Sequence, residues 1–267
     1  MVKSKLPIAP FRGKKPASVE SHGDIPKVIT FWSPKTAGKT TLAAAVAAAL
    51  TRSGRSVACA DFDVLTPDLP GRGYNLDQVS EEVLRGDFDP GKTAQNLTRL
   101  QPSGVHLLAG LTDPVRAESL GRSELLALAG AMAKAYDVVI LDTNQTLVLE
   151  ATLAALDAAD LVIIPVAPAE NQVRHVGRYL TLLEQGLRLD KSKIRVVANH
   201  MAGSVTLPVA TVEQVLGRAV AGQVPYYRDW ATWTGENLPP VDRREGLLVV
   251  LVSVPLQGPG EGGGMSW

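Results

Sequence analysis

The sequence predicts an α/β fold in which a mainly parallel sheet is doubly wound, that is, covered by helices on both faces. Two observations lead to this prediction. Short β-branched runs alternate with longer Ala- and Leu-rich segments through most of the 267 residues. The short runs are continuously apolar, which is typical of strands that are buried on both faces. A chain of this length forms one large domain or at most two small ones.

Each predicted strand is a short apolar run. The first contains Val-Ile-Thr-Phe and the fourth contains Val-Val-Ile-Leu. In chain order the predicted strands cover residues 27–32, 56–60, 105–109, 137–141, 161–166 and 194–198.

The longer segments between these runs are predicted to be helices because they are rich in Ala and Leu, which are strong helix formers. The first helix follows a Gly-Lys-Thr sequence directly. In chain order the predicted helices cover residues 38–53, 76–85, 123–135, 149–158, 171–185 and 211–220.

The two ends of the chain differ from this pattern, so we expect three parts. Residues 1–26 form a basic arm in which Pro7, Pro10 and Pro16 break helical patterns, and we expect it to be flexible and solvated rather than bound to lipid or nucleic acid. Residues 27–245 form the main domain. Residues 246–267 hold an apolar run, 247–256, and a Gly-rich tail. Because this run has no polar face, we expect a core or edge strand rather than a helix lying on a membrane.

Composition excludes several classes of protein. The single cysteine, Cys59, cannot form an internal disulfide or a cysteine-built zinc site, which favours a reducing compartment. The 27 basic and 27 acidic residues balance, unlike the basic excess of a dedicated nucleic-acid binder. No apolar run reaches the roughly 20 residues that span a bilayer. We therefore expect a cytoplasmic protein.

A candidate phosphate-binding loop follows the first predicted strand. Its sequence is Ser33-Pro-Lys-Thr-Ala-Gly-Lys-Thr-Thr41, and a helix follows at once. Backbone N–H groups at such a turn point at an anion, Lys39 can reach its oxygens, and Thr40 can ligate Mg²⁺. The usual pattern has glycine where Ser33 stands. A second Gly-Lys-Thr, residues 91–93, follows Asp-Pro rather than a strand, and we expect a turn without chemistry there.

Carboxylates follow two other predicted strands. Asp61 and Asp63 end the second strand, and Asp142 ends the strand 137–141. The carboxyl ends of parallel strands face one crevice, so these groups should lie near the phosphate-binding loop. One carboxylate there can hold metal-bound water, and another can orient an attacking water.

At these residues the chain resembles the ParA/MinD ATPases, the P-loop branch with a deviant Walker A motif. The resemblance covers residues 27–242 and includes Tyr136-Asp-Val-Val-Ile-Leu-Asp-Thr143, Val196-Val-Ala-Asn199 and the stretch 107–118. Within the branch the chain looks most like the CpaE/TadZ-type pilus-assembly ATPases and their MinD-like relatives. The resemblance implies a P-loop NTPase fold of the SIMIBI type, with ATP and Mg²⁺ as ligands.

The resemblance also implies roles for single residues. Gly38, Lys39, Thr40 and Thr41 would bind the phosphates, and Thr40, Asp61 and Asp142 would belong to the Mg²⁺ site. Asp63 would position the attacking water and Asn199 would read adenine. Lys35 looks like the signature lysine, which reaches across an ATP-bridged homodimer. The family further implies a protein partner in an assembly or positioning system and peripheral contact with the membrane; a DNA partner is not favoured.

Two departures from the family pattern leave alternatives open. The loop is one residue shorter, so either Lys35 is the signature lysine or Pro34 takes its place. Thr36 and Ala37 replace glycines, and their Cβ atoms should hinder positive φ. Asn144-Gln145 stands where the family has Pro-Pro, so we expect a less rigid loop. Nucleotide binding survives these changes more easily than hydrolysis, and a degenerate nucleotide-binding scaffold is the alternative function.

An aromatic cluster lies near the expected base pocket. It consists of Tyr226, Tyr227, Trp230 and Trp233. We expect these rings to pack under the final loop rather than to form a partner surface.

Overall fold

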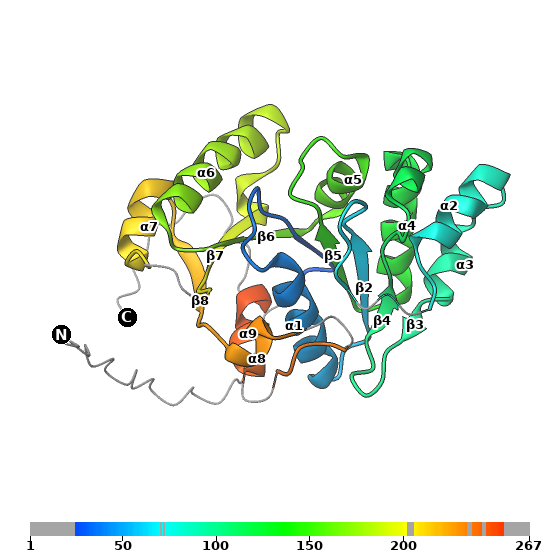
Figure 1. Ribbon diagram of the computed structural model, residues 1–267, viewed down its shortest axis with the longest axis horizontal. Helices are drawn as coiled ribbons and strands as arrows, with labels where there is room; N and C mark the ends of the chain where they lie inside the picture. Colours follow the sequence, from blue (N-terminus) through cyan, green and yellow to red (C-terminus); the bar gives the residue numbers. More distant parts are fainter. Residues whose placement is uncertain are drawn as a thin grey trace, which may run out of the picture.

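The structure is a computed structural model that describes residues 25–69, 71, 73–201, 206–233, 237–241 and 244–253 (Figure 1). In this part of the chain, eight strands form one sheet in the order β3-β4-β2-β5-β1-β6-β7-β8, and every neighbouring pair except β3–β4 is parallel. The strands are β1 Val28–Phe31, β2 Val57–Phe62, β3 Thr98–Arg99, β4 His106–Leu108, β5 Val138–Thr143, β6 Leu161–Val166, β7 Ile194–Asn199 and β8 Val220–Val224.

Helices cover both faces of this sheet, which confirms the predicted doubly wound α/β fold. Figure 1 shows α1, α8 and α9 on one side and α4, α5, α6 and α7 on the other. The helices are α1 Lys39–Arg52, α2 Leu76–Arg85, α3 Pro90–Gln95, α4 Arg122–Ala135, α5 Glu150–Ala158, α6 Glu170–Thr181, α7 Val209–Leu216, α8 Arg228–Ala231 and α9 Glu245–Ser253. Shorter turns of helix are η1 Pro114–Ser119, η2 Leu182–Gly186 and η3 Lys191–Lys193. None of these helices is long and apolar enough to cross a bilayer.

The six predicted strands and six predicted helices are all present, with shifted ends. The last predicted helix, 211–220, is wrong at its end because Gly217 has a φ of 65° and stops α7 at Leu216. Val220 then begins β8, which the pattern missed. The burial of β8 alternates, so it lacks the continuous apolar run of the inner strands.

The apolar run 247–256 was predicted to be a strand, and this prediction is wrong. Glu245–Ser253 forms helix α9, which packs against α1, and residues 254–256 lie outside the described residues. Leu248, Leu251 and Val252 recur at helical spacing and are buried in the same core as the apolar face of α1. Tertiary packing on α1 therefore outweighs the strand propensity of the valines.

Two further contacts fix α9 in place. The Arg195 guanidinium on β7 donates a hydrogen bond to the carbonyl of Leu251 at 3.2 Å. Gly222 on β8 gives room to Leu251, since a Cβ at this glycine would lie 2.4 Å from a Leu251 methyl group. The helix is thus part of the main core rather than an appended segment.

This packing predicts a large difference between two valines of α9. Val252→Ala should lower the free energy of unfolding by about 2 kcal/mol because the side chain is fully buried. Val250→Ala, the matched control, should cost about 0.5 kcal/mol or less because Val250 is 45% exposed. Chemical denaturation of both variants measures the difference. Equal losses would mean that α9 is not docked as described.

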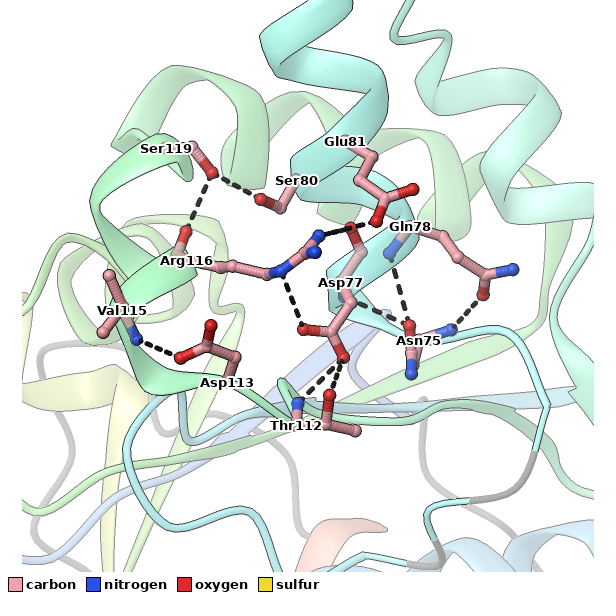
Figure 2. A network of polar contacts seen from close by, with 10 residues as sticks. All are labelled: Asn75, Asp77, Gln78, Ser80, Glu81, Thr112, Asp113, Val115, Arg116 and Ser119. Atoms are coloured by element: carbon pink, nitrogen blue, oxygen red, sulfur yellow. Dashed lines mark hydrogen bonds and ion pairs between the residues drawn. The ribbon is translucent and has the colours of Figure 1, made fainter.

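A polar network fixes the outer edge of the sheet next to α2 (Figure 2). Asp77 accepts hydrogen bonds from the amide and the hydroxyl of Thr112 at 2.8 and 2.7 Å. Arg116 lies 3.7 Å from the Asp77 carboxylate and pairs with Glu81 at 2.7 Å. Asn75 caps α2 in a reciprocal capping box with Gln78. The network holds the loop after β4 against α2. Because β2 and β4 are parallel, this loop lies at the carboxyl ends of the strands, as does the loop after β2.

Candidate nucleotide site

The loop between β1 and α1 turns at Gly38. This residue caps α1 with left-handed backbone angles, φ 72° and ψ 35°. Arg188 is the one non-glycine residue with positive φ in the described part of the chain, so Thr36 and Ala37 adopt ordinary angles. The expected hindrance by their Cβ atoms therefore does not arise, because neither residue adopts positive φ. The shortened loop needs a single left-handed residue, and glycine occupies that position.

A cavity of about 320 Å³ lies over the start of α1. Its lining comes from the loop before α1, the first turn of α1, the loops after β2 and β5, and Met201. The lining residues are Thr36, Ala37, Gly38, Lys39, Thr40, Thr41, Asp63, Thr66, Asp68, Asn144, Gln145 and Met201. The predicted phosphate-binding residues and Asp63 thus share one cavity with the N-terminus of α1, where backbone N–H groups favour an anion.

Asp142 meets this loop from β5. Its register neighbours are Phe31 on β1 and Asp61 on β2. The Thr40 hydroxyl donates a hydrogen bond to Asp142 Oδ2 at 2.5 Å. Asp142 Oδ1 is buried and has no hydrogen-bond partner among the described residues. A buried carboxylate oxygen without a donor is costly, and this one lies beside a hydroxyl that could also ligate a cation.

The electrostatics of Asp142 point the same way. Burial, with a smaller contribution from the charge of Asp63, raises the pKa of Asp142 to about 7, although the Thr40 hydrogen bond and the Lys39 charge oppose the shift. A cation would relieve this unfavourable charge. Within the described residues, no group of three or more His, Cys, Asp or Glu could hold a metal by itself. Mg²⁺ often takes only one or two protein ligands with substrate oxygens and water, so Thr40 and Asp142 fit it.

Asp61 lies beside Asp142 but is used differently. Its two carboxylate oxygens accept hydrogen bonds from the amides of Asp63 and Leu69, each at 3.0 Å. Burial and the charge of Asp142 raise the pKa of Asp61 well above its ordinary value. These contacts hold the loop 63–69 in place. The role of Asp61 at a metal stays a prediction.

Asp63 is 7% exposed and holds a turn of its own loop. Its Oδ1 accepts hydrogen bonds from the amides of Leu65 and Thr66 at 3.2 and 2.8 Å, and its Oδ2 accepts one from the Thr66 hydroxyl at 3.1 Å. The side-chain amide of Asn144 also donates to Oδ1, at 2.7 Å. We expected the loop after β5 to be less rigid because Asn144-Gln145 replaces two prolines there. The hydrogen bond from Asn144 connects this loop to the loop after β2.

Asn199 reaches the loop from the end of β7. Its Nδ2 donates to the carbonyl of Ala37 at 2.8 Å, and a Cβ at Gly38 would lie 2.7 Å from the same nitrogen. Its carbonyl oxygen could accept a hydrogen bond from the amino group of a base. Gly38, Asn199 and eight neighbours line an adjoining pocket of about 240 Å³: Thr41, His200, Met201, Pro225, Tyr226, Tyr227, Trp230 and Ala231.

The aromatic cluster borders this pocket and packs mostly inward. Trp230 is buried, its ring lies 4.8 Å from that of Tyr227, and its Nε1 donates to the carbonyl of Pro240 at 2.7 Å. The Arg244 guanidinium lies 4.1 Å from the centre of the Tyr227 ring. Tyr226 is the exception, because it is exposed at the pocket.

Lys35, unlike the other predicted residues of the phosphate-binding loop, does not line the cavity over α1. It is exposed and absent from the cavity lining, whereas Lys39 lines it.

The sequence analysis did not identify Thr66 as a residue of the cavity, and it did not predict the position of Asn144. Their available signal is that each lies two or three residues after a carboxylate that ends a strand.

The second Gly-Lys-Thr was predicted to be a turn, and this is wrong. Gly91, Lys92 and Thr93 lie in the short helix α3. The Asp89 carboxylate accepts hydrogen bonds from the amides of Gly91 and Lys92 at 2.9 and 3.1 Å. A carboxylate already occupies the place where an anion would bind, which fits the absence of chemistry that we expected.

The raised pKa of Asp142 predicts opposite pH effects on folding and on metal binding. The folded chain holds a proton on Asp142 between the ordinary value of 3.8 and about 7, where the unfolded chain does not. The metal-free native protein should therefore gain stability over Asp142→Asn as pH falls from about 8 to about 5. Mg²⁺-dependent nucleotide affinity should fall about tenfold per pH unit below pH 7. Melting curves measure the stability difference between the two proteins across this pH range, and titrations measure the nucleotide affinity. If neither the stability difference nor the affinity changed with pH, both predictions would be contradicted.

Comparisons with known proteins agree with this geometry. Residues 29–241 match the family model described as the CobQ/CobB/MinD/ParA nucleotide binding domain. The chromosome-partitioning ATPase Soj of Thermus thermophilus is 32% identical over 150 residues, which are 55% of this chain. That match spans 57% of the length of Soj.

Solved structures share the fold. The ParA family ATPase of Chlorobium tepidum has a TM-score of 0.69 at 18% identity, covering 88% of this chain and all of that one. The septum site-determining protein MinD of Pyrococcus horikoshii, complexed with Mg-ADP, has a TM-score of 0.66 at 21% identity, covering 85% of this chain and 94% of that one.

The fold and the loop before α1 define a P-loop nucleotide-binding protein. The family match covers most of the chain. The chain therefore belongs to the CobQ/CobB/MinD/ParA family and carries its ParA/MinD-type nucleotide-binding domain.

Proposed function

We propose that this chain binds ATP with Mg²⁺ in the cavity over α1 and hydrolyses it to ADP and phosphate. The observation that carries the proposal is the contact between Thr40 and Asp142, with a second buried Asp142 oxygen left without a donor. This pair lies at the start of α1, where the backbone N–H groups and Lys39 suit phosphate oxygens.

Each residue then has a definite task. Gly38, Lys39, Thr40 and Thr41 bind the phosphates. Thr40 and Asp142 hold Mg²⁺, which when bound offsets charge on the phosphate oxygens. Asp63 orients the attacking water, and the Asn199 carbonyl oxygen accepts a hydrogen bond from the amino group of adenine.

We further propose an ATP-bridged homodimer. The support is Lys35, which is exposed and does not line the cavity of its own chain, so it is available to a second copy. The site would then be complete only in the dimer. Hydrolysis would reopen it, and the dimer state would govern the binding of a partner protein.

The partner belongs to an assembly or positioning system, and the chain acts in the cytoplasm or at the inner face of the membrane. Support comes from the relatives, since Soj is a chromosome-partitioning ATPase and a MinC:MinD complex of Aquifex aeolicus has the same fold, at 20% identity and a TM-score of 0.62. A role in pilus assembly, as in CpaE/TadZ-type proteins, rests on the sequence resemblance.

A second candidate is a nucleotide-gated scaffold without turnover. One observation favours it: Asp63 is engaged by four hydrogen bonds, which limits its access to water. Binding would still close the dimer.

Phosphate release measured with Mg²⁺ over a series of protein concentrations separates the two candidates. A working dimeric ATPase predicts turnover per chain that rises with concentration. Tight ATP binding with no turnover would contradict hydrolysis and leave the scaffold. No ATP binding at all would overturn both.

A further inference from the structure

Asn144 joins the two loops that carry the carboxylates of the site. It lies two residues after Asp142 and is 5% exposed. Its Nδ2 donates to Asp63 Oδ1 at 2.7 Å, and its Oδ1 accepts from the amide of Thr146 at 2.8 Å. One end of the side-chain amide is thus fixed to its own loop, and the other end holds the loop after β2.

The backbone just before Asn144 is held in the sheet. The preceding residue, Thr143, is fully buried and donates its hydroxyl to the carbonyl of Phe31 at 2.8 Å. Thr143 ends β5, which lies between β1 and β2 in the sheet, and Asn144 follows it directly. Asn144 therefore keeps a fixed place relative to Asp142 and the phosphate-binding loop.

The other contacts of Asp63 are local. Leu65 and Thr66 belong to the same turn, so their hydrogen bonds shape the turn and move with it. The bond from Asn144 connects residues 81 positions apart in the chain. It is therefore suited to set where the Asp63 carboxylate lies relative to the rest of the site.

The two carboxylate oxygens of Asp63 accept different numbers of hydrogen bonds. Oδ1 accepts three hydrogen bonds and Oδ2 accepts one, from the Thr66 hydroxyl. A carboxylate has about four lone-pair sites, two on each oxygen, so Oδ2 retains room for another donor. Asp63, Thr66 and Asn144 all line the cavity over α1.

We propose that Asn144 is a positioning residue for hydrolysis. By holding Asp63 Oδ1 from across the site, it directs Oδ2 at the water that attacks the terminal phosphate. It acts through Asp63 and need not touch the nucleotide. This role rests on the proposed ATPase function.

The test is phosphate release at saturating ATP, with ATP affinity and melting temperature measured on the same samples. Asn144→Ala should lower turnover at least about tenfold, because small misplacements of reacting groups are costly. Its ATP affinity should stay within about threefold of the native value, because the phosphate contacts remain. Asn96→Ala, at an exposed asparagine at the end of α3, is the control and should change neither quantity.

Two further substitutions separate positioning from simple support. Asn144→Asp keeps an oxygen for the Thr146 amide but has no donor for Asp63, so it should lose at least as much turnover as Asn144→Ala. Asn144→Gln keeps the amide and should retain more turnover than Asn144→Ala.

Native turnover in Asn144→Ala would overturn the role of Asn144, as would parallel losses of turnover, affinity and melting temperature. A native chain that binds ATP and releases no phosphate would overturn the proposed hydrolysis, and this role with it. The two failures are thus distinguished by the native protein alone.

Discussion

Replacing Gly38 with alanine should severely weaken the binding of Mg-ATP. Two costs combine at this residue. Its φ of 72° is left-handed, which costs a residue with a side chain about 1–2 kcal/mol. The new Cβ would also lie 2.7 Å from Asn199 Nδ2, so Asn199 must leave the carbonyl of Ala37 or the loop must shift. We expect ATP affinity to fall at least about a hundredfold, as for a loss of about 3 kcal/mol.

Gly86→Ala is the matched control for this experiment. Gly86 has a φ of 77° at the end of α2, and a Cβ there would meet nothing within 4 Å. It shares the backbone cost of Gly38→Ala but has no contact with the site. Calorimetric titration with Mg-ATP should therefore show native affinity for Gly86→Ala, while both variants melt at lower temperature. Equal affinities in the two variants would show that the turn at Gly38 does not form the site.

Replacing Lys39 with alanine should be nearly as severe. Lys39 lines the cavity, and its ammonium is close enough to Asp142 to lower the pKa of that carboxyl against the effect of burial. A charge-assisted contact with a phosphate contributes about 1.5–3 kcal/mol, so we expect ATP affinity to fall about tenfold to a hundredfold.

The chain supplies its own control in the second Gly-Lys-Thr. Lys92 is exposed on α3, and the Asp89 carboxylate already accepts the amides at that helix start. Lys92→Ala should therefore bind ATP as the native chain does. Titration of both variants under one set of conditions makes the comparison. Comparable losses at Lys39 and Lys92 would mean that the effect comes from net charge rather than from the site.

The fold and most of the site could be predicted from short stretches of sequence. Continuous apolar runs specify inner strands of a parallel sheet, and the ends of such strands meet at one edge whatever the loops do. For this reason Asp63 and Asp142 were expected near residues 33–41, and the structure places them there.

The features that the sequence analysis predicted wrongly or missed depend on contacts between distant segments. Helix α9 has the composition of a strand and is helical because it packs on α1. Strand β8 has no continuous apolar run and forms by pairing with β7. The bond between Asn144 and Asp63 joins two loops, and neither loop indicates the other in the sequence. Local patterns carry no information on such pairings.

The Mg²⁺ dependence of ATP binding tests most directly whether residues 33–41 and Asp142 form one nucleotide site. ATP should be titrated into the native chain and into Asp142→Asn, each with Mg²⁺ and with the metal chelated. We predict that the native chain binds a single ATP and does so at least about tenfold more tightly with Mg²⁺. Asp142→Asn should bind ATP equally with and without the metal. Absence of ATP binding, or the same Mg²⁺ dependence in both proteins, would contradict the site.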